Sequence, residues 1–251
     1  YAYSYAYLFS ISYSDFEKLV NPKKAISFST RPRYRALVSN VSPEDARQKF
    51  KNYQSCILGL SLENEELSTA KLVAITDWIS KNFKKCTAVL GDSLYRITLQ
   101  IDRGFNEKQA VNKALLMGRE YVDKESIVFD RHADTCLFDI VFCSEIQKWD
   151  AYAEYYKKIQ DLFGQDDKFA NSVRYWAREF VSRRLEQNSE FFDSKIEISC
   201  TYQLEELAIF ACLAQSGLSV IVYPGSLDIF AEIAEGQHPN VPDCLQKIIH
   251  I

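Results

Sequence analysis

Long apolar runs are missing from this sequence. It contains no stretch of about 18 consecutive apolar residues, the length that a helix needs to cross a bilayer. The aromatic first residues, 1–13, also lack a basic leader followed by an apolar segment. We therefore expect a cytoplasmic protein without a membrane partner.

The usual local signatures of metal and nucleotide sites are missing too. The seven cysteines form no Cys-x-x-Cys pair, and His132, His238 and His250 lie far apart in sequence. A Gly-x-x-x-x-Gly-Lys phosphate loop does not occur. We expect no metal and no other cofactor. Because the cysteines are odd in number and mostly within apolar runs, we expect reduced core thiols.

Glycine and proline are scarce, with eight and six residues among 251, whereas hydrophobic residues make up 47%. This composition is typical of a globular protein with few long loops, and the length predicts one α/β domain over residues 1–251. The formal net charge of -4 argues against a protein that coats nucleic acid uniformly. It leaves room for local basic surfaces.

Short apolar runs alternate with segments of helical periodicity. The predicted strands are 56–60, 87–90, 127–129, 138–143 and 218–223; the predicted helices are 68–84, 107–122, 151–163, 168–185 and 202–214. Residues 196–201 fit either type. The alternation predicts a Rossmann-like parallel sheet flanked by helices. Functional crevices of such sheets lie at the carboxyl ends of strands, where strand order reverses, so we expect Ser61, Asp92 and Tyr223 to end strands there.

Ser61 leaves a predicted buried strand two residues after Gly59. A serine in this place is exposed above the sheet, and the glycine lets a substrate approach the backbone, so the serine can act as a nucleophile. It can equally cap a turn. Glu63 occupies the fifth position of a Gly-x-Ser-x-Gly pattern, where the tight hydrolase turn needs glycine. The pattern is therefore not a hydrolase elbow.

Tyr202 and Glu206 lie four residues apart on a predicted helix and therefore share one face. A phenol and a carboxylate together can hold an ammonium group. Glu205 competes for the same role on the same geometric argument, and a solvated helix face is the alternative.

Three segments in this order resemble the cyclodipeptide synthases. They are Ser61 within Gly-Leu-Ser-Leu-Glu-Asn, the segment Tyr202-Gln-Leu-Glu-Glu206 about 140 residues later, and Tyr223 at the end of the next strand. The likeness runs from about Ser55 to Phe230 and includes Trp149-Asp150 ahead of an aromatic helix. The resemblance implies a fold like the catalytic domain of class I aminoacyl-tRNA synthetases. It also implies an enzyme that uses two aminoacyl-tRNAs, through an aminoacyl-enzyme and a dipeptidyl-enzyme on Ser61, to form a cyclic dipeptide.

The resemblance also assigns roles by motif position. Ser61 becomes the nucleophile, Tyr202 and Glu206 bind the substrate amino group, and Tyr223 helps to position the acyl-enzyme. Asn64 is a further candidate catalytic residue; it looks like one of two subfamilies, whereas Pro224 looks like the other. The first side-chain pocket would comprise Ile57, Gly59, Val89, Ile209 and Ile221, which suggests an uncharged first amino acid.

We expect tRNA to bind a basic surface. The resemblance points to the helix after the second strand, which carries Lys108, Lys113 and Arg119. By charge alone, residues 168–184, with Arg174 and Arg178, and residues 22–40 are stronger candidates; solvated faces are the alternative. We expect a monomer. The chain lacks His-x-Gly-His and Lys-Met-Ser-Lys-Ser sequences, so we expect no ATP-dependent activation. Two other functions fit the residues: a non-catalytic binder of aminoacyl-tRNA, and a serine acyltransferase or hydrolase of small esters.

Overall fold

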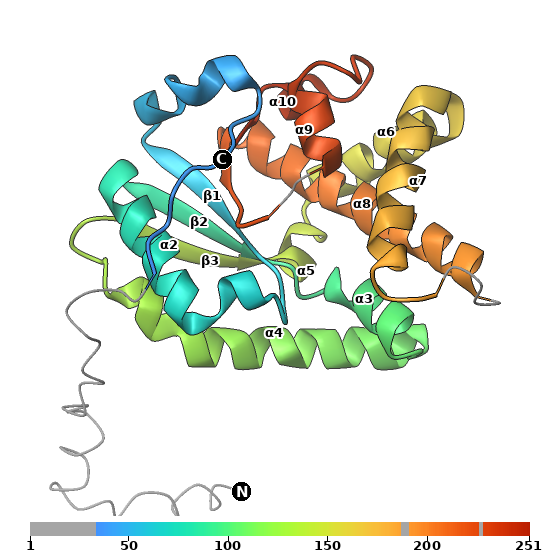
Figure 1. The fold of residues 1–251 in the computed structure, drawn as a ribbon, viewed down its shortest axis with the longest axis horizontal. Coiled ribbons are helices and arrows are strands. Elements are labelled where there is room, and N and C mark those ends of the chain that lie inside the picture. Colours follow the sequence, from blue (N-terminus) through green and yellow to red (C-terminus); the bar gives the residue numbers. More distant parts are fainter. Residues whose placement is uncertain (1–33, 187–190, 226–227) are drawn as a thin grey trace, which may run out of the picture. The chain divides into compact units, whose positions relative to one another are not determined.

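Five parallel strands form one sheet in the computed structural model of the chain, which describes residues 34–186, 191–225 and 228–251. The strand order is β3-β2-β1-β4-β5, and all neighbouring strands run parallel (Figure 1). The strands are β1 (Ser55–Leu60), β2 (Lys85–Leu90), β3 (Leu137–Phe142), β4 (Val220–Val222) and β5 (Ile249–His250). The predicted parallel α/β sheet is confirmed.

Helices follow or connect these strands. The 3-10 helices are η1 (Glu44–Arg47), η2 (Phe50–Asn52) and η3 (Glu65–Leu67). The α-helices are α2 (Thr69–Asn82), α3 (Tyr95–Asp102), α4 (Glu107–Asp130), α5 (Cys143–Ile146), α6 (Asp150–Gln165), α7 (Asp167–Ser182), α8 (Phe192–Gln215), α9 (Asp228–Ala234) and α10 (Asp243–Gln246). Among the described residues, no helix combines the length and the apolar character that crossing a bilayer requires.

The prediction of a strand at 127–129 is wrong, because α4 continues through these residues to Asp130. Val128 and Phe129 are buried on one side of this helix, and the Phe129 ring lies 5.6 Å from the ring of Phe138 in β3. A short apolar run cannot distinguish a strand from the buried turn of a helix. The ambiguous residues 196–201 belong to α8.

Side chains of the strands alternate between two helical layers. Val89 points toward α8 and shares its buried cluster, whereas the neighbouring Leu90 faces α4, where a Cβ added to Gly118 would lie 3.6 Å from the Leu90 side chain. Figure 1 shows α2 and α4 on one side of the strands and α6, α7 and α8 on the other. The sheet is therefore covered on both faces, as parallel sheets require.

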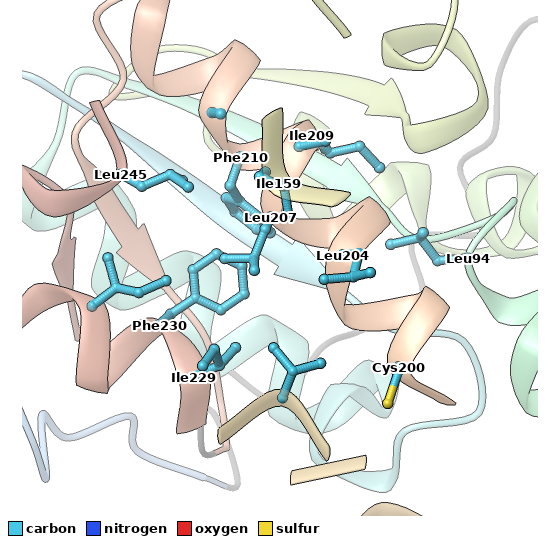
Figure 2. Close-up of a cluster of buried hydrophobic side chains, with 14 of the residues drawn as sticks. Leu94, Ile159, Cys200, Leu204, Leu207, Ile209, Phe210, Ile229, Phe230 and Leu245 are labelled. Carbon is cyan, nitrogen blue, oxygen red and sulfur yellow. The ribbon is translucent and has the colours of Figure 1, made fainter. Parts of the chain in front are cut away.

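Helix α8 forms the centre of the larger core. Apolar residues surround it on almost every side, as expected of a helix that is buried rather than amphipathic. Leu204, Leu207 and Phe210 pack against neighbouring helices, and the ring of Phe210 lies 5.1 Å from that of Phe230 in α9 (Figure 2). Each such side chain contributes about 1.5–3 kcal/mol through burial. This packing fixes which face of α8 remains open to a cavity.

Strand order reverses between β1 and β4. From β1 the chain moves outward through β2 to β3, and then returns to the other side of β1 with β4 and β5. Ser61 and Tyr223 follow directly after β1 and β4, so they flank this switch point as predicted. Asp92 also follows its strand, but its buried carboxylate accepts hydrogen bonds from the backbone N–H and the hydroxyl of Ser144.

Candidate active site

The parallel pairing of β1 with β4 brings Ser61 next to Tyr223. Ile57 lies opposite Ile221 in this pairing, and two strands that start in register also end close together. The hydroxyl oxygens of Ser61 and Tyr223 are hydrogen-bonded at 2.9 Å. The Asn64 amide nitrogen lies 3.5 Å from the Tyr223 hydroxyl and donates toward it.

Asn64 is held by the helix that it caps. Its side-chain oxygen accepts the backbone N–H of Glu66 at 2.9 Å, which is the usual N-cap bond at the start of η3. With the oxygen engaged in this way, the amide NH₂ group faces Tyr223. Asn64 therefore contacts the hydroxyl pair. Pro224, which resembles the other subfamily, directly follows Tyr223 in the same chain.

Glycine at position 59 makes room for the Tyr223 ring. A Cβ added to Gly59 would lie 2.9 Å from Cδ2 of Tyr223, and one added to Gly225 would lie 3.1 Å from Cε1. Contacts below about 3.0 Å are not tolerated between carbon atoms, so the ring could not stay in place beside an alanine at position 59. Gly59, two residues before Ser61, is therefore needed to make space for the Tyr223 ring and not to form a tight turn.

Tyr202 and Glu206 face the same cavity as the hydroxyl pair. This cavity has a volume of about 520 Å³ and is lined by Ser61, Asn64 and Tyr223 as well. The Tyr202 hydroxyl donates to Glu206 Oε1 at 3.3 Å. The five predicted catalytic residues, Asn64 among them, therefore line one cavity.

Burial changes the protonation chemistry of these groups. It raises the pKa of Glu206 to about 7, against a smaller opposing effect of the Tyr202 hydrogen bond. It also raises the pKa of Tyr202 well above its ordinary value, with the nearby Glu206 carboxylate acting in the same direction. Burial raises the pKa of Tyr223, while its hydrogen bond with Ser61 lowers it. Both phenols are thus neutral groups that can donate and accept hydrogen bonds at pH 7.

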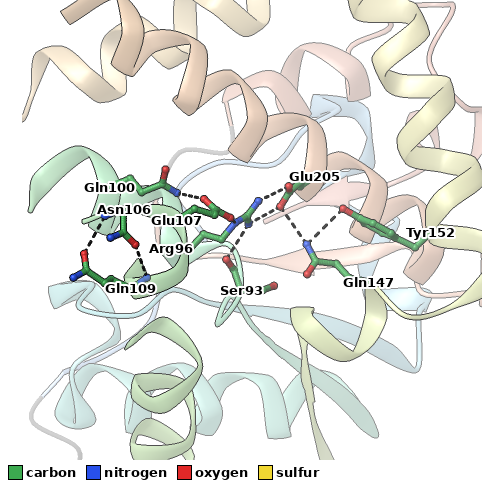
Figure 3. Close-up of polar contacts among 9 residues, drawn as sticks. All are labelled: Ser93, Arg96, Gln100, Asn106, Glu107, Gln109, Gln147, Tyr152 and Glu205. Carbon is green, nitrogen blue, oxygen red and sulfur yellow. Dashed lines mark hydrogen bonds and ion pairs between the residues drawn. The ribbon is translucent and has the colours of Figure 1, made fainter. Parts of the chain in front are cut away.

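Glu205 and Glu206 point in different directions from α8, and only Glu206 lines the cavity. Glu205 is buried and turned away from the cavity, where it forms two bonds with Arg96, of 2.6 and 2.8 Å (Figure 3). It also accepts from Gln147 at 3.2 Å, while Arg96 bonds to Glu107 at the start of α4. Successive helical residues are rotated by about 100°, so only one of the two carboxylates can face the cavity.

The predicted pocket residues do not line this cavity. Ile57, Val89, Ile209 and Ile221 lie in the core between the sheet and α8, each at most 3% exposed. Gly59 lies beneath the Tyr223 ring. These positions form the floor below the site.

The predicted tRNA-binding residues lie outside the cavity. Lys108, Lys113 and Arg119 are on α4, whereas Arg174 and Arg178 are exposed on α7. The guanidinium group of Arg174 lies over the ring of Phe163, and that of Arg178 lies over the ring of Phe192. Of the basic stretch 22–40, residues 22–33 lie outside the described part of the chain.

Sequence reasoning missed the outer wall of the cavity. Its aromatic and basic part comprises Trp176, Phe180, Arg183 and Arg184, and a further part comes from Tyr95 and Thr98 of α3. The sequence predicts a helix over residues 168–185 and a candidate basic surface over residues 168–184, but no cavity wall. The spacing of Trp176 and Phe180 by four residues was the signal of an aromatic face next to that charge.

The arrangement suits acyl transfer. It combines a hydroxyl nucleophile, neutral phenols that can relay protons, and a carboxyl group whose pKa is close to that of an α-amino group, about 7.7–8.0. Among the described residues, no histidine lines the cavity. Within this lining, the hydroxyl of Ser61 is hydrogen-bonded to that of Tyr223.

The fold matches solved cyclodipeptide synthases. One from Bacillus thermoamylovorans aligns with a TM-score of 0.71 and 22% identity, covering 84% of this chain and 94% of that chain. One from Candidatus Glomeribacter gigasporarum, solved bound to Phe-tRNAPhe, gives 0.59 and 15%, covering 78% and 86%. A Mycobacterium tuberculosis protein gives 0.60 and 19%, covering 74% and 80%; its structure is described as demonstrating that cyclodipeptide synthetases are related to type I tRNA synthetases.

At these identities the structures establish the fold, including the expected likeness to class I synthetases. A search of curated proteins finds no significant match. The sequence itself matches the cyclodipeptide synthase family model over residues 40–240, which contain every residue of the hydroxyl, phenol and carboxylate cluster. The chain belongs to the cyclodipeptide synthase family.

Proposed function

We propose that this chain is an active cyclodipeptide synthase, in which one catalytic domain joins the amino acids of two aminoacyl-tRNAs by way of esters on Ser61. The observation that carries the proposal is the 2.9 Å contact between the hydroxyls of Ser61 and Tyr223 in a cavity shared with Glu206. The ester of each substrate already carries the activation, so the reaction needs no ATP.

In the first step, Ser61 Oγ attacks the ester carbonyl of one aminoacyl-tRNA. The bond from Oγ to the carbonyl carbon forms and the bond to the ribose oxygen breaks. The serine proton passes to the departing ribose oxygen, through the Tyr223 hydroxyl or a neighbouring ribose hydroxyl. Glu206 and Tyr202 hold the amino group of the acyl chain meanwhile.

In the second step, the amine of the acyl group on Ser61 attacks the ester of the second aminoacyl-tRNA. Glu206 takes a proton from the ammonium form, because the two pKa values are close. A C–N bond forms, the second ribose ester breaks, and the released proton goes to that ribose oxygen. The product is a dipeptidyl ester on Ser61.

In the third step, the new free amine attacks the Ser61 ester. The second amide bond forms, the bond to Oγ breaks, and a proton returns to Oγ as the cyclic dipeptide leaves. Tyr202 is the proposed relay, because its hydroxyl can accept from the amine and donate to the departing oxygen.

The remaining assignments complete the proposal. Lys108, Lys113 and Arg119 on α4, with Arg174 and Arg178 on α7, are proposed to contact tRNA phosphates. We further propose a cytoplasmic monomer.

Two experiments test this function against its alternatives. Bacteria expressing the chain should release diketopiperazines that mass spectrometry detects in the medium, and the Ser61→Ala variant should release none. A binder without turnover would give no product from either chain. With purified protein, RNase should abolish the reaction, whereas a hydrolase of small esters would be insensitive to it.

A further inference from the structure

Among the described residues, the hydroxyl of Tyr202 makes one hydrogen bond, and that bond is long. Its distance of 3.3 Å to Glu206 is long for an O–H···O bond, which is ordinarily about 2.7–2.8 Å. A bond of this length does little to fix the ring. The orientation of the Tyr202 side chain must therefore come from the groups that pack against the ring itself.

Phe180 of α7 packs against that ring. The two rings are nearly parallel, at 17°, with their centroids 6.4 Å apart. Both Phe180 and Tyr202 line the cavity. Offset parallel rings at this distance favour one relative orientation.

Arg184 also packs against Phe180. Its guanidinium carbon lies only 3.6 Å from the centroid of the Phe180 ring, and its Nη1 donates to the Phe180 carbonyl at 3.1 Å. Its Nε lies 3.2 Å from a carboxylate oxygen of Asp102, the last residue of α3. A planar guanidinium can form this stack and these polar contacts together, which an ammonium cannot.

These contacts make one continuous series from α3 through α7 to α8: Asp102, Arg184, Phe180 and Tyr202. We propose that Phe180 is a positioning residue that sets the Tyr202 hydroxyl for cyclisation, and that Arg184, anchored by Asp102, holds Phe180 in place. The inference deepens the proposed function and rests on the role of Tyr202 as the relay in its third step.

The test separates the chemical steps by single-turnover mass spectrometry of the whole protein with aminoacyl-tRNA. In Phe180→Leu, acylation of Ser61 should slow much less than cyclisation, because Glu206 still pairs with the substrate amino group. Cyclisation depends on the placement of the Tyr202 hydroxyl and should slow by up to about 100-fold, the cost of misplacing a catalytic group. The dipeptidyl-enzyme should then accumulate. Phe180→Tyr keeps the ring and should restore cyclisation.

Arg184→Lys tests the stack without removing a core ring. It keeps the charge opposite Asp102 but loses the planar group over Phe180, so it should also slow cyclisation more than acylation, by about 10-fold. The matched control is Phe163→Leu on α6, where a phenylalanine also lies under an arginine, with the Arg174 guanidinium 4.7 Å from its ring, but outside the cavity. This control should leave the ratio of the two rates unchanged.

The outcomes distinguish the inference from the proposed function. If Tyr202→Phe stalls cyclisation but Phe180→Leu and Arg184→Lys do not, the positioning role is wrong while the function stands. Equal losses in both steps would mean that Phe180 serves only the fold, and would also overturn the inference. If Tyr202→Phe itself cyclises normally, the relay role fails, and the positioning proposal fails with it.

Discussion

The hydroxyl oxygens of Ser61 and Tyr223 lie 2.9 Å apart although 162 positions separate the two residues in the chain. The contact depends on three features of the fold: β4 returns beside β1, both strands end at the switch point, and Gly59 leaves space for the ring. It makes Tyr223 the nearest protein group that can exchange a proton with the nucleophile.

Tyr223→Phe should therefore slow acylation of Ser61, by up to about 100-fold, the lower range of what a positioned proton-transfer group contributes. The ring itself remains between Gly59 and Gly225, so the melting temperature should change little. Rapid-quench measurement of acyl-enzyme formation tests this. Acylation at the wild-type rate would assign the proton transfer to the substrate alone.

Gly59→Ala should reproduce much of that defect without touching either hydroxyl. The added methyl group would lie 2.9 Å from the Tyr223 ring and must displace it. Gly164→Ala in α6 is the matched control, since its methyl group would meet no atom within 4 Å. The control should be active and stabilised by about 0.5–1 kcal/mol. An active Gly59→Ala enzyme would contradict the account of this glycine.

Much of this site was predictable, because the residues that carry it stand at strand ends and on one helix face. The apolar run before Ser61 predicts its strand, and the spacing of Tyr202 and Glu206 predicts their shared face. Pairing of β1 with β4 does not follow from either pattern. It depends on strand order, which the sequence specifies only through packing of distant elements.

The pH dependence of the reaction should report Glu206. Burial raises its pKa to about 7, so the free enzyme carries a neutral carboxyl below that pH and cannot pair with the substrate ammonium. The value of kcat/KM should therefore rise with pH and level off above about 7. In Glu206→Gln, most of the activity should be lost, and the remaining activity should no longer rise with pH in this range. An unchanged profile in the variant would assign the titration to another group.

The same group should make stability depend on pH. Its pKa is higher in the folded protein than the ordinary value of 4.5, so its contribution to stability is present below pH 4.5 and is lost as pH rises to about 7. Above pH 7, Glu206→Gln should be more stable than the wild type, by about 2 kcal/mol since the cavity leaves the carboxyl partly solvated. Urea unfolding at pH 5 and pH 8 measures the difference. A constant difference would contradict it.

Substitution of Glu205 should lower the stability of the protein, whereas substitution of Glu206 should raise it. Its carboxylate and the Arg96 guanidinium are both largely buried, so Glu205→Gln or Arg96→Met alone should cost about 3 kcal/mol by leaving a charge without its partner. The double variant Arg96→Met with Glu205→Leu should recover most of this. Chemical unfolding of the three variants is the measurement. A double variant as unstable as the singles would contradict the pairing.

The outer wall of the cavity shows why the remaining part was not predictable. Trp176 and Phe180 resemble ordinary core positions of an amphipathic helix in sequence, and Arg184 resembles a solvated charge. Only the packing of α7 against α8 shows that Phe180 meets Tyr202. Similarly, residues 127–129 have strand-like composition, but they lie in the last turns of α4, where Phe129 packs against Phe138 in β3.

The central claim is that Ser61 carries the acyl group. Purified protein should be mixed with aminoacyl-tRNA, quenched in acid and digested, and the peptide containing residue 61 analysed by mass spectrometry. We predict one aminoacyl mass on Ser61 in the wild type, and neither added mass nor cyclic dipeptide in Ser61→Ala. Cyclic dipeptide formed by Ser61→Ala at the wild-type rate would contradict the account.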